Sequence, residues 1–220
     1  MSDLPLVSCL MPTYNRREFF PRAVRCFLSQ DYPNTEWIVL DDGTDLIKDL
    51  LPPDPRIKYY HELPKRNHGQ KMNRCMELAQ GEYAIVWDDD DWYSPNRVSR
   101  QIEPMLRDSK IQVTGTSQLY YALHGTQRAF HYVNRTALAW IGAIAFRKST
   151  WEAHRFNEKP HGADYDFLTQ VPRDQWCDLA DTTLLVAAAH PTNAARKSMP
   201  SSSFVEVPWA AVQAIAKGEL

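Results

Sequence analysis

Short apolar runs alternate with amphipathic segments along the first half of the chain. Runs rich in β-branched and aromatic residues predict strands, at residues 4–11, 36–40, 56–61 and 83–87. Two segments between these runs carry apolar side chains at helical spacing and predict helices, at residues 17–30 and 70–80. We expect Pro12 to end the first strand, Asn15 to cap the first helix and Gly81 to stop the second.

The second half of the chain is less regular. A helix is predicted from Pro95 to about Leu106, and an aromatic-rich hairpin or flap from Leu119 to Tyr132. Further strands are predicted at residues 111–116, 140–146 and 183–189, and further helices at 162–171 and 209–217. The alternation of strands and helices predicts an α/β fold, in which helices cover a parallel sheet and ligands collect at the carboxyl ends of its strands.

The composition is that of a globular protein. The chain has 220 residues, of which 44% are hydrophobic and 24% charged, and this length fits one domain. Because 25 Lys and Arg oppose 27 Asp and Glu, no overall charge favours nucleic acid or an anionic membrane. Without a signal peptide or an apolar run of about 18 residues, a cytoplasmic protein is expected. The four cysteines lack metal-binding spacing and are expected to be reduced, buried thiols.

Carboxylates follow two of the predicted strands. The run Asp88–Asp91 comes directly after the strand at 83–87, and Asp41-Asp42 follows the strand at 36–40. Four adjacent carboxylates repel one another unless a cation neutralises them. A hard divalent ion, Mn²⁺ or Mg²⁺, is the expected partner, held by one or two carboxylates and completed by substrate phosphates. An acidic turn or helix N-terminus is the alternative, since Asp is favoured at both.

Four sequence motifs resemble those of family 2 glycosyltransferases. Val7–Arg16 resembles the family's opening strand, and Val39–Thr44 resembles its second-strand nucleotide motif. Ala79–Tyr83 and Trp87–Trp92 resemble the helix, strand and DxD motif that follow. The order, spacing and strand context agree over about residues 5–106, which makes the joint match stronger than a lone DxD.

This resemblance implies a GT-A fold, in which helices flank a Rossmann-like, mostly parallel sheet beside a smaller mixed acceptor-side region. It implies one domain over 1–220, with a nucleotide-sugar-binding half at 1–106 and an acceptor-binding half at 107–220. The expected reaction is the metal-dependent, inverting transfer of a sugar from a nucleotide-diphosphate sugar, with UDP as the first choice, to a hydroxyl acceptor. A glycan is the first expectation for that acceptor.

The resemblance also implies roles for individual residues. Thr13 and Tyr14 would lie against the nucleoside, Asp42 would accept a hydrogen bond from the base, and Asp88 would face the ribose. The full set of implied donor contacts is Pro12, Thr13, Tyr14, Asn15, Arg16, Asp41, Asp42, Lys71, Asp88 and Asp89. Lys71-Met72-Asn73 stands where the family often has Ala-Arg-Asn, so Lys71 takes the place of a donor-binding Arg.

Metal ligands and a general base are implied in the same way. Asp90 would bind the cation, with Asp91 as a second contact, and His190 would provide a metal or phosphate contact or serve a structural purpose. His161–Phe167 resembles the family's Glu-Asp-x-Asp segment, with Ala in the position of the Glu. Asp164 is the first candidate for the base that inversion requires, and Asp166 is the second.

Three other functions fit parts of the sequence. A glycosyltransferase acting on hydroxymethylated bases in DNA is favoured by basic residues at 65–74, 147–148 and 196–197 and by the aromatics between 120 and 132. A metal-dependent nucleotidyltransferase or phosphohydrolase also uses clustered carboxylates. A non-catalytic nucleotide- or glycan-binding module is the third, because Met72 and Ala163 depart from the family pattern.

Overall fold

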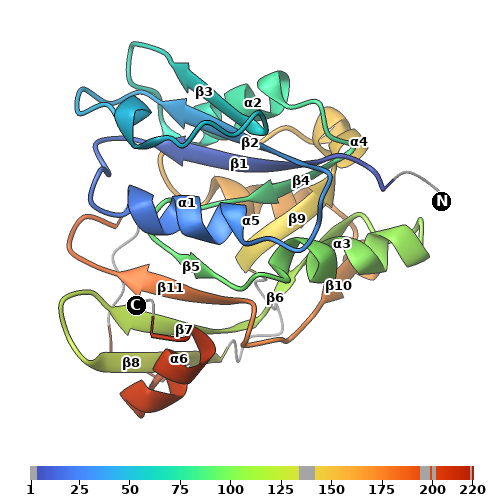
Figure 1. The fold of residues 1–220 in the computed structure, drawn as a ribbon. Coiled ribbons are helices and arrows are strands. Elements are labelled where there is room, and N and C mark those ends of the chain that lie inside the picture. Colours follow the sequence, from blue (N-terminus) through green and yellow to red (C-terminus); the bar gives the residue numbers. More distant parts are fainter. Residues whose placement is uncertain (1–3, 134–141, 194–198, 200–201, 219) are drawn as a thin grey trace.

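The larger of two sheets forms the centre of the fold (Figure 1). We describe a computed structural model, in which residues 4–133, 142–193, 199, 202–218 and 220 are placed. In order across this seven-stranded sheet, the strands are β10 (Trp176–Asp178), β6 (Val113–Thr116), β9 (Gly142–Arg147), β4 (Tyr83–Val86), β1 (Val7–Thr13), β2 (Thr35–Asp41) and β3 (Ile57–His61). β1 runs parallel to β2 and β4, and only β9 is antiparallel to its neighbours among these strands.

A second, mixed sheet lies below the first in Figure 1. Its strands are β12 (Phe204–Val207), β8 (Arg128–Val133), β7 (Gln118–Leu123), β11 (Leu185–Ala189) and β5 (Trp92–Tyr93). The predicted aromatic hairpin is confirmed as the antiparallel pair of β7 and β8. Because β5 directly follows the aspartate run and pairs with β11, this sheet brings residues after 189 next to the aspartates.

Helices cover both faces of the larger sheet. They are α1 (Phe20–Leu28), α2 (His68–Leu78), α3 (Arg97–Arg107), α4 (Lys148–Ala153) and α5 (Ala163–Gln170), whereas α6 (Trp209–Ile215) packs on β8 of the second sheet. Two 3₁₀ turns lie at Lys48–Leu50 and Arg173–Gln175. Alternate residues of β1 point to opposite faces, so Cys9 packs with α1 and α3 whereas Leu10 packs with α2 and α5. The mostly parallel α/β fold predicted from the sequence is therefore confirmed.

The structure corrects the expected end of the first strand. β1 continues through Pro12 to Thr13, and Pro12 stands opposite Leu40 of β2. The Leu10 carbonyl accepts a bond from Trp87 N, on the side of β4, and Pro12 faces the same side two residues later. Since β4 has ended at that level, the missing N–H of Pro12 removes no ladder hydrogen bond.

Two other local predictions were wrong. Phe19, not Asn15, is the N-cap of α1, and Asn15 adopts a left-handed conformation with φ 52°. α2 ends with Ala79 as its C-cap, so Gly81 does not stop the helix. A Cβ at Gly81 would lie 2.7 Å from the Leu6 carbonyl oxygen, which shows that this glycine is needed for close backbone approach.

The remaining expectations concern thiols and membrane spans. Cys9, Cys26 and Cys75 are buried, Cys177 is partly buried, and all four are free, as expected. Burial raises the pKa of Cys9 and Cys75 to about 12, so these thiols stay protonated. No helix in the described part of the chain is both long and apolar enough to span a membrane. Trp140 and Ile141, at the start of one predicted strand, lie outside the described residues.

Candidate active site

The ends of β1, β2 and β4 bring most of the predicted donor residues to one edge of the larger sheet. Thr13 stands opposite Asp41 in the register of β1 and β2, and Leu10 stands opposite Val86 in the register of β1 and β4. Because parallel strands end at the same edge, the Asp41-Asp42 pair and the aspartate run flank the end of β1.

Asp89 is held against the end of β1. The Thr13 hydroxyl donates to Asp89 Oδ2 over 2.6 Å, and both residues are buried. Burial, followed by the charge of Asp90, raises the pKa of Asp89 to about 7. The Asp89 side chain therefore links the aspartate run to Thr13 at the end of β1.

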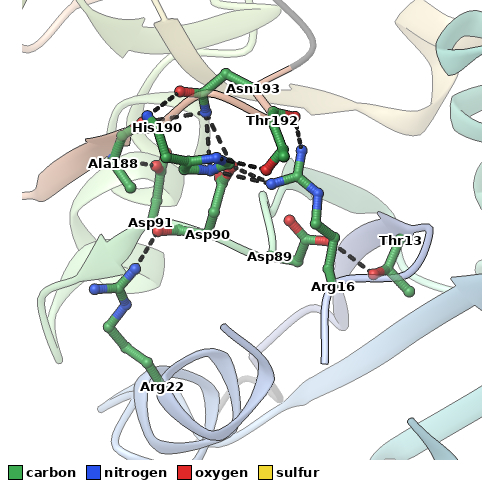
Figure 2. A network of polar contacts seen from close by, with 10 residues as sticks. All are labelled: Thr13, Arg16, Arg22, Asp89, Asp90, Asp91, Ala188, His190, Thr192 and Asn193. Carbon is green, nitrogen blue, oxygen red and sulfur yellow. Dashed lines mark hydrogen bonds and ion pairs between the residues drawn. The ribbon is translucent and has the colours of Figure 1, made fainter. Parts of the chain in front are cut away.

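Asp90 lies at the centre of a polar network (Figure 2). Arg16 Nη1, His190 Nε2 and Asn193 Nδ2 lie 3.3, 2.8 and 3.1 Å from the same oxygen, Asp90 Oδ2. Arg22, on α1, donates to the backbone carbonyl of Asp90. The contacts of Asp90 thus come from both halves of the chain, and its carboxylate is bound to basic and amide groups.

His190 is held by contacts of its ring and of its backbone. Its ring stacks on Phe19, with centroids 4.6 Å apart, and its backbone N–H donates to Asn193 Oδ1 over 2.6 Å. The Thr192 hydroxyl lies 2.8 Å from His190 Nδ1. If that hydroxyl donates, Nε2 carries the ring proton and donates to Asp90. His190 and Asp90, which were both expected as metal contacts, therefore lie side by side.

The other two aspartates have different surroundings. Asp91 Oδ1 accepts a hydrogen bond from the Ala188 N–H over 2.8 Å, and burial together with the charges of Asp90 and Asp88 raises the pKa of Asp91 well above its usual value. Asp88 is half-buried, and its backbone N–H donates to the Tyr93 hydroxyl over 2.8 Å. Asp91 thus anchors the run to β11, while Asp90 contacts His190.

The ligand chemistry around Asp90 fits a hard divalent cation. Mn²⁺ and Mg²⁺ prefer oxygen ligands, and the Asp90 carboxylate supplies one, with the His190 imidazole beside it. Among the residues that the structure describes, no three His, Cys, Asp or Glu side chains are grouped so that they would hold a metal alone. A cation at Asp90 would therefore need oxygen ligands from a phosphate or from water.

Asp41 and Asp42 are engaged within the protein. Asp41 accepts hydrogen bonds from the Gly43 N–H and the Tyr59 hydroxyl, each over 2.9 Å. Burial and the Asp41 hydrogen bond raise the pKa of Tyr59. Asp42 accepts from the backbone N–H of Arg66 over 2.7 Å and from the ammonium of Lys71 over 3.1 Å. Lys71 also donates to the Thr13 carbonyl over 3.2 Å, so it joins the ends of β1 and β2.

The residues just after β1 form the rim of the same region. The ammonium of Lys65 lies 3.5 Å from the centroid of the half-buried Tyr14 ring. Asn15 Oδ1 accepts from the backbone N–H groups of Thr44 and Asp45 over 2.8 and 2.9 Å. Asn15 therefore fixes the loop after β2 to the loop after β1.

The two candidate bases differ in their environment. Asp164 is half-buried in the first turn of α5, and its negative charge opposes the lowering of the His68 pKa that burial causes. Asp166 accepts a hydrogen bond from Asn157 Nδ2 over 2.8 Å and pairs with Lys159 over 2.5 Å, contacts that lower the pKa of Asp166. Asp164 is thus close to the N-terminus of α2, whereas Asp166 has local partners.

Some residues of the network were not singled out from the sequence. Phe19, Arg22, Thr192 and Asn193 contact His190, Asp90 or Arg16 in the structure. The string His190-Pro191-Thr192-Asn193 after a strand was the available signal for two of them. Arg22 lies within an amphipathic helix and had no such signal.

Comparison with known proteins identifies the class. The family model "Glycosyl transferase family 2" matches residues 8–153. The chain therefore belongs to glycosyltransferase family 2, as its motifs implied.

Individual relatives give the extent of the likeness. The putative colanic acid biosynthesis glycosyl transferase WcaA of Escherichia coli K12 is 40% identical over 104 residues, which are 45% of this chain and 37% of that protein. The GalNAc(5)-diNAcBac-PP-undecaprenol beta-1,3-glucosyltransferase of Campylobacter jejuni is 25% identical over 176 residues, 72% of this chain and 57% of that protein. The matched part of the chain thus spans little more than half of these relatives at most.

Solved structures confirm the GT-A fold. The mannosyltransferase PcManGT from Pyrobaculum calidifontis, in complex with GDP-Man and Mn²⁺, superposes with a TM-score of 0.67 at 16% identity, covering 88% of this chain and 59% of that one. S. aureus TarS (residues 1–349) in complex with UDP-GlcNAc gives a TM-score of 0.68 at 16% identity, covering 86% and 60%.

Proposed function

We propose that the chain transfers a sugar from a nucleoside-diphosphate sugar to a hydroxyl acceptor by a single displacement, with a divalent cation at Asp90. The observation that carries the proposal is the convergence of Thr13, Asp42 and Asp90 at one sheet edge, with His190 against Asp90. Structural neighbours that bind GDP-Man with Mn²⁺ and UDP-GlcNAc support this class of donor. A UDP-sugar is our first choice.

The residues of the site divide the work of this reaction. Tyr14 and the Asp41-Asp42 pair, at the ends of β1 and β2, are the proposed nucleoside side, and Asp88 faces the ribose. A cation bound at Asp90, with Asp91 and His190 beside it, would neutralise the charge that develops on the diphosphate as it leaves. Asp89 is buried against Thr13, so we assign it the task of holding the run in place.

Proton transfer is assigned to α5. The acceptor oxygen attacks the anomeric carbon as the bond from that carbon to the diphosphate breaks, and the acceptor proton passes to Asp164. Attack from the face opposite the leaving group inverts the configuration. Asp166 is the weaker choice because Lys159 and Asn157 already contact its carboxylate.

A glycan is the acceptor that we propose. The DNA alternative rests on basic residues, and several of these are engaged inside the protein: Arg66 and Arg74 both pair with Glu62, over 3.1 and 2.7 Å, and Arg147 donates to the Tyr83 hydroxyl over 2.9 Å. Residues 196–197 lie outside the described part of the chain. The pairing of Arg66, Arg74 and Arg147 within the protein therefore weakens the DNA alternative.

The test begins with the donor. Thermal shift with UDP-glucose, UDP-galactose, UDP-N-acetylglucosamine and GDP-mannose, each with Mn²⁺, identifies the donor, and release of free nucleotide with an acceptor panel measures transfer. Asp90→Ala is expected to abolish turnover, whereas Asp108→Ala, at an exposed position, leaves it intact. Full turnover in excess chelator would rule out the cation, and failure of every nucleotide sugar to bind would overturn the proposal.

A further inference from the structure

Arg16 occupies the position beside Asp90 where a cation would be expected. Its Nη1 lies 3.3 Å from Asp90 Oδ2 and 3.0 Å from His190 Nε2, and its Nη2 donates to the Thr192 carbonyl over 2.7 Å. Figure 2 shows the guanidinium meeting the Asp90 carboxylate beside His190, while Arg22 reaches the backbone of Asp90 separately. One guanidinium thus bridges the aspartate run and the segment after β11.

The backbone before Arg16 directs it to this place. Asn15 has the left-handed φ of 52°, and its side chain is bound by the N–H groups of Thr44 and Asp45. The turn is closed on the other side by the Phe19 N–H, which donates to the Arg16 carbonyl over 3.1 Å. Arg16 is therefore held at its backbone, and its long side chain is the part that is able to move.

The charges explain why the guanidinium lies there. Asp90 is flanked in sequence by three more aspartates, and its own side chain is only 11% exposed, against 17% for Arg16. A poorly solvated carboxylate beside other acids needs a positive neighbour. A divalent ion would meet the same oxygen, and two cations would then repel each other at close range.

We propose that Arg16 is the internal counter-cation of Asp90 in the metal-free protein and is exchanged onto the donor's diphosphate when the cation and donor bind. The exchange of Arg16 onto the diphosphate rests on the proposed function. A guanidinium released from Asp90 matches phosphate oxygens through its planar fork of N–H donors. Arg16 thereby lowers the affinity for the cation alone and raises the affinity for the diphosphate.

The first test measures cation binding without any donor. Mn²⁺ is titrated into the protein and free Mn²⁺ is followed by electron paramagnetic resonance. Arg16→Met is expected to tighten Mn²⁺ binding on the order of tenfold. This is the lower end of the change that one nearby opposite charge causes in the proton-binding constant of a carboxylate. Arg17→Met is the matched control, because Arg17 pairs with the exposed Asp49 and not with the aspartate run, and it should leave Mn²⁺ binding unchanged.

The second test uses UDP at saturating Mn²⁺. Arg16→Met should weaken UDP binding on the order of tenfold, Arg16→Lys should weaken it less because it keeps the charge, and Arg17→Met should not change it. Arg16→Gln replaces the Met variant if circular dichroism shows that the latter is unfolded. Unchanged or weaker Mn²⁺ binding in the uncharged variants would show that Arg16 is not the counter-cation of Asp90. Unchanged UDP binding would show that Arg16 does not move onto the diphosphate. Neither result depends on sugar transfer, so a protein that binds Mn²⁺ but transfers no sugar would contradict only the proposed function.

Discussion

The ammonium of Lys71 lies 3.1 Å from Asp42 Oδ1, in an ion pair that is almost closed to solvent. The Asp42 side chain has no exposed surface and that of Lys71 is 9% exposed. Each group has a second partner, since Lys71 donates to the Thr13 carbonyl and Asp42 accepts from the Arg66 N–H. The pair therefore ties β1, β2 and α2 together at the edge where the donor is expected.

Removing one partner of this pair should be costly. Lys71→Met leaves the Asp42 carboxylate buried without its counter-charge, and a broken buried pair typically costs about 3 kcal/mol or more of unfolding free energy. Urea denaturation of Lys71→Met against the wild type measures this loss. The variant should also bind the donor more weakly, because the ends of β1 and β2 lose their shared contact.

A double-mutant cycle checks the assignment. Asp42→Asn combined with Lys71→Met should lose less stability than the two single changes added together, since no unpaired charge remains. Lys58→Met, at an exposed lysine on β3, is expected to change the unfolding free energy by no more than about 0.5 kcal/mol. Additive effects of the two single changes would show that Lys71 and Asp42 do not interact.

The order of strands and helices was readable from the sequence because burial imposes periodicity. β2 is apolar except at its ends and in Glu36, and the stripe of Met72, Cys75 and Met76 faces the core. Parallel pairing then places the acids at the ends of β2 and β4 at the same edge of the larger sheet. This placement does not depend on which side chains the acids contact. The fold class and the expected location of the candidate site follow from these two facts.

Hydrophobic periodicity does not predict which side chains each carboxylate contacts. Arg16 and His190 are 174 positions apart and meet only because β5 pairs with β11. No local pattern encodes that contact. The N-cap expected at Asn15 failed for a related reason, since its side chain is used by the loop after β2 instead of by α1. A tertiary contact took precedence over a local preference.

Gly43 is predicted to be intolerant of a side chain. A Cβ there would lie 2.5 Å from Asn15 Oδ1 and 2.8 Å from the Asn15 backbone nitrogen, so the loop that leads to Arg16 would have to shift. Gly43→Ala should lower the unfolding free energy by about 1–3 kcal/mol and weaken donor binding. Thermal unfolding and UDP titration measure the two effects. Asp45→Ala, at an exposed position, is the control, because it keeps the backbone N–H of residue 45 that binds Asn15. Equal behaviour of the two variants would contradict the steric argument.

Glu62 is predicted to contribute stability that depends on pH. Arg74 and then Arg66 lower the pKa of Glu62 below its usual 4.5, through contacts of 2.7 and 3.1 Å. Since the unfolded chain then binds the proton more tightly, the contribution is complete above pH 4.5 and is lost as the pH falls through the folded-state pKa. Glu62→Gln should remove about 1 kcal/mol at pH 7 and flatten the unfolding free energy between about pH 5 and 3. If the unfolding free energy falls equally steeply with pH in the wild type and in Glu62→Gln, Glu62 does not contribute to this acid transition.

Substitution of the two acids of α5, Asp164 and Asp166, should lower kcat to different extents. Asp166 is bound by Asn157 and Lys159, which lower its pKa and hold its carboxylate at the protein surface, whereas Asp164 lies toward His68 at the start of α2. Asp164→Asn is therefore expected to lower kcat by about 10²–10⁴, the usual contribution of a general base, with donor binding unchanged. Asp166→Asn serves as the matched control and should retain most of the turnover. Because both substitutions remove one charge from the same helix turn, a shared electrostatic effect on α5 would lower kcat equally in the two variants. The reverse order of effects would assign the base to Asp166 and would mean that Lys159 releases its carboxylate when the acceptor binds.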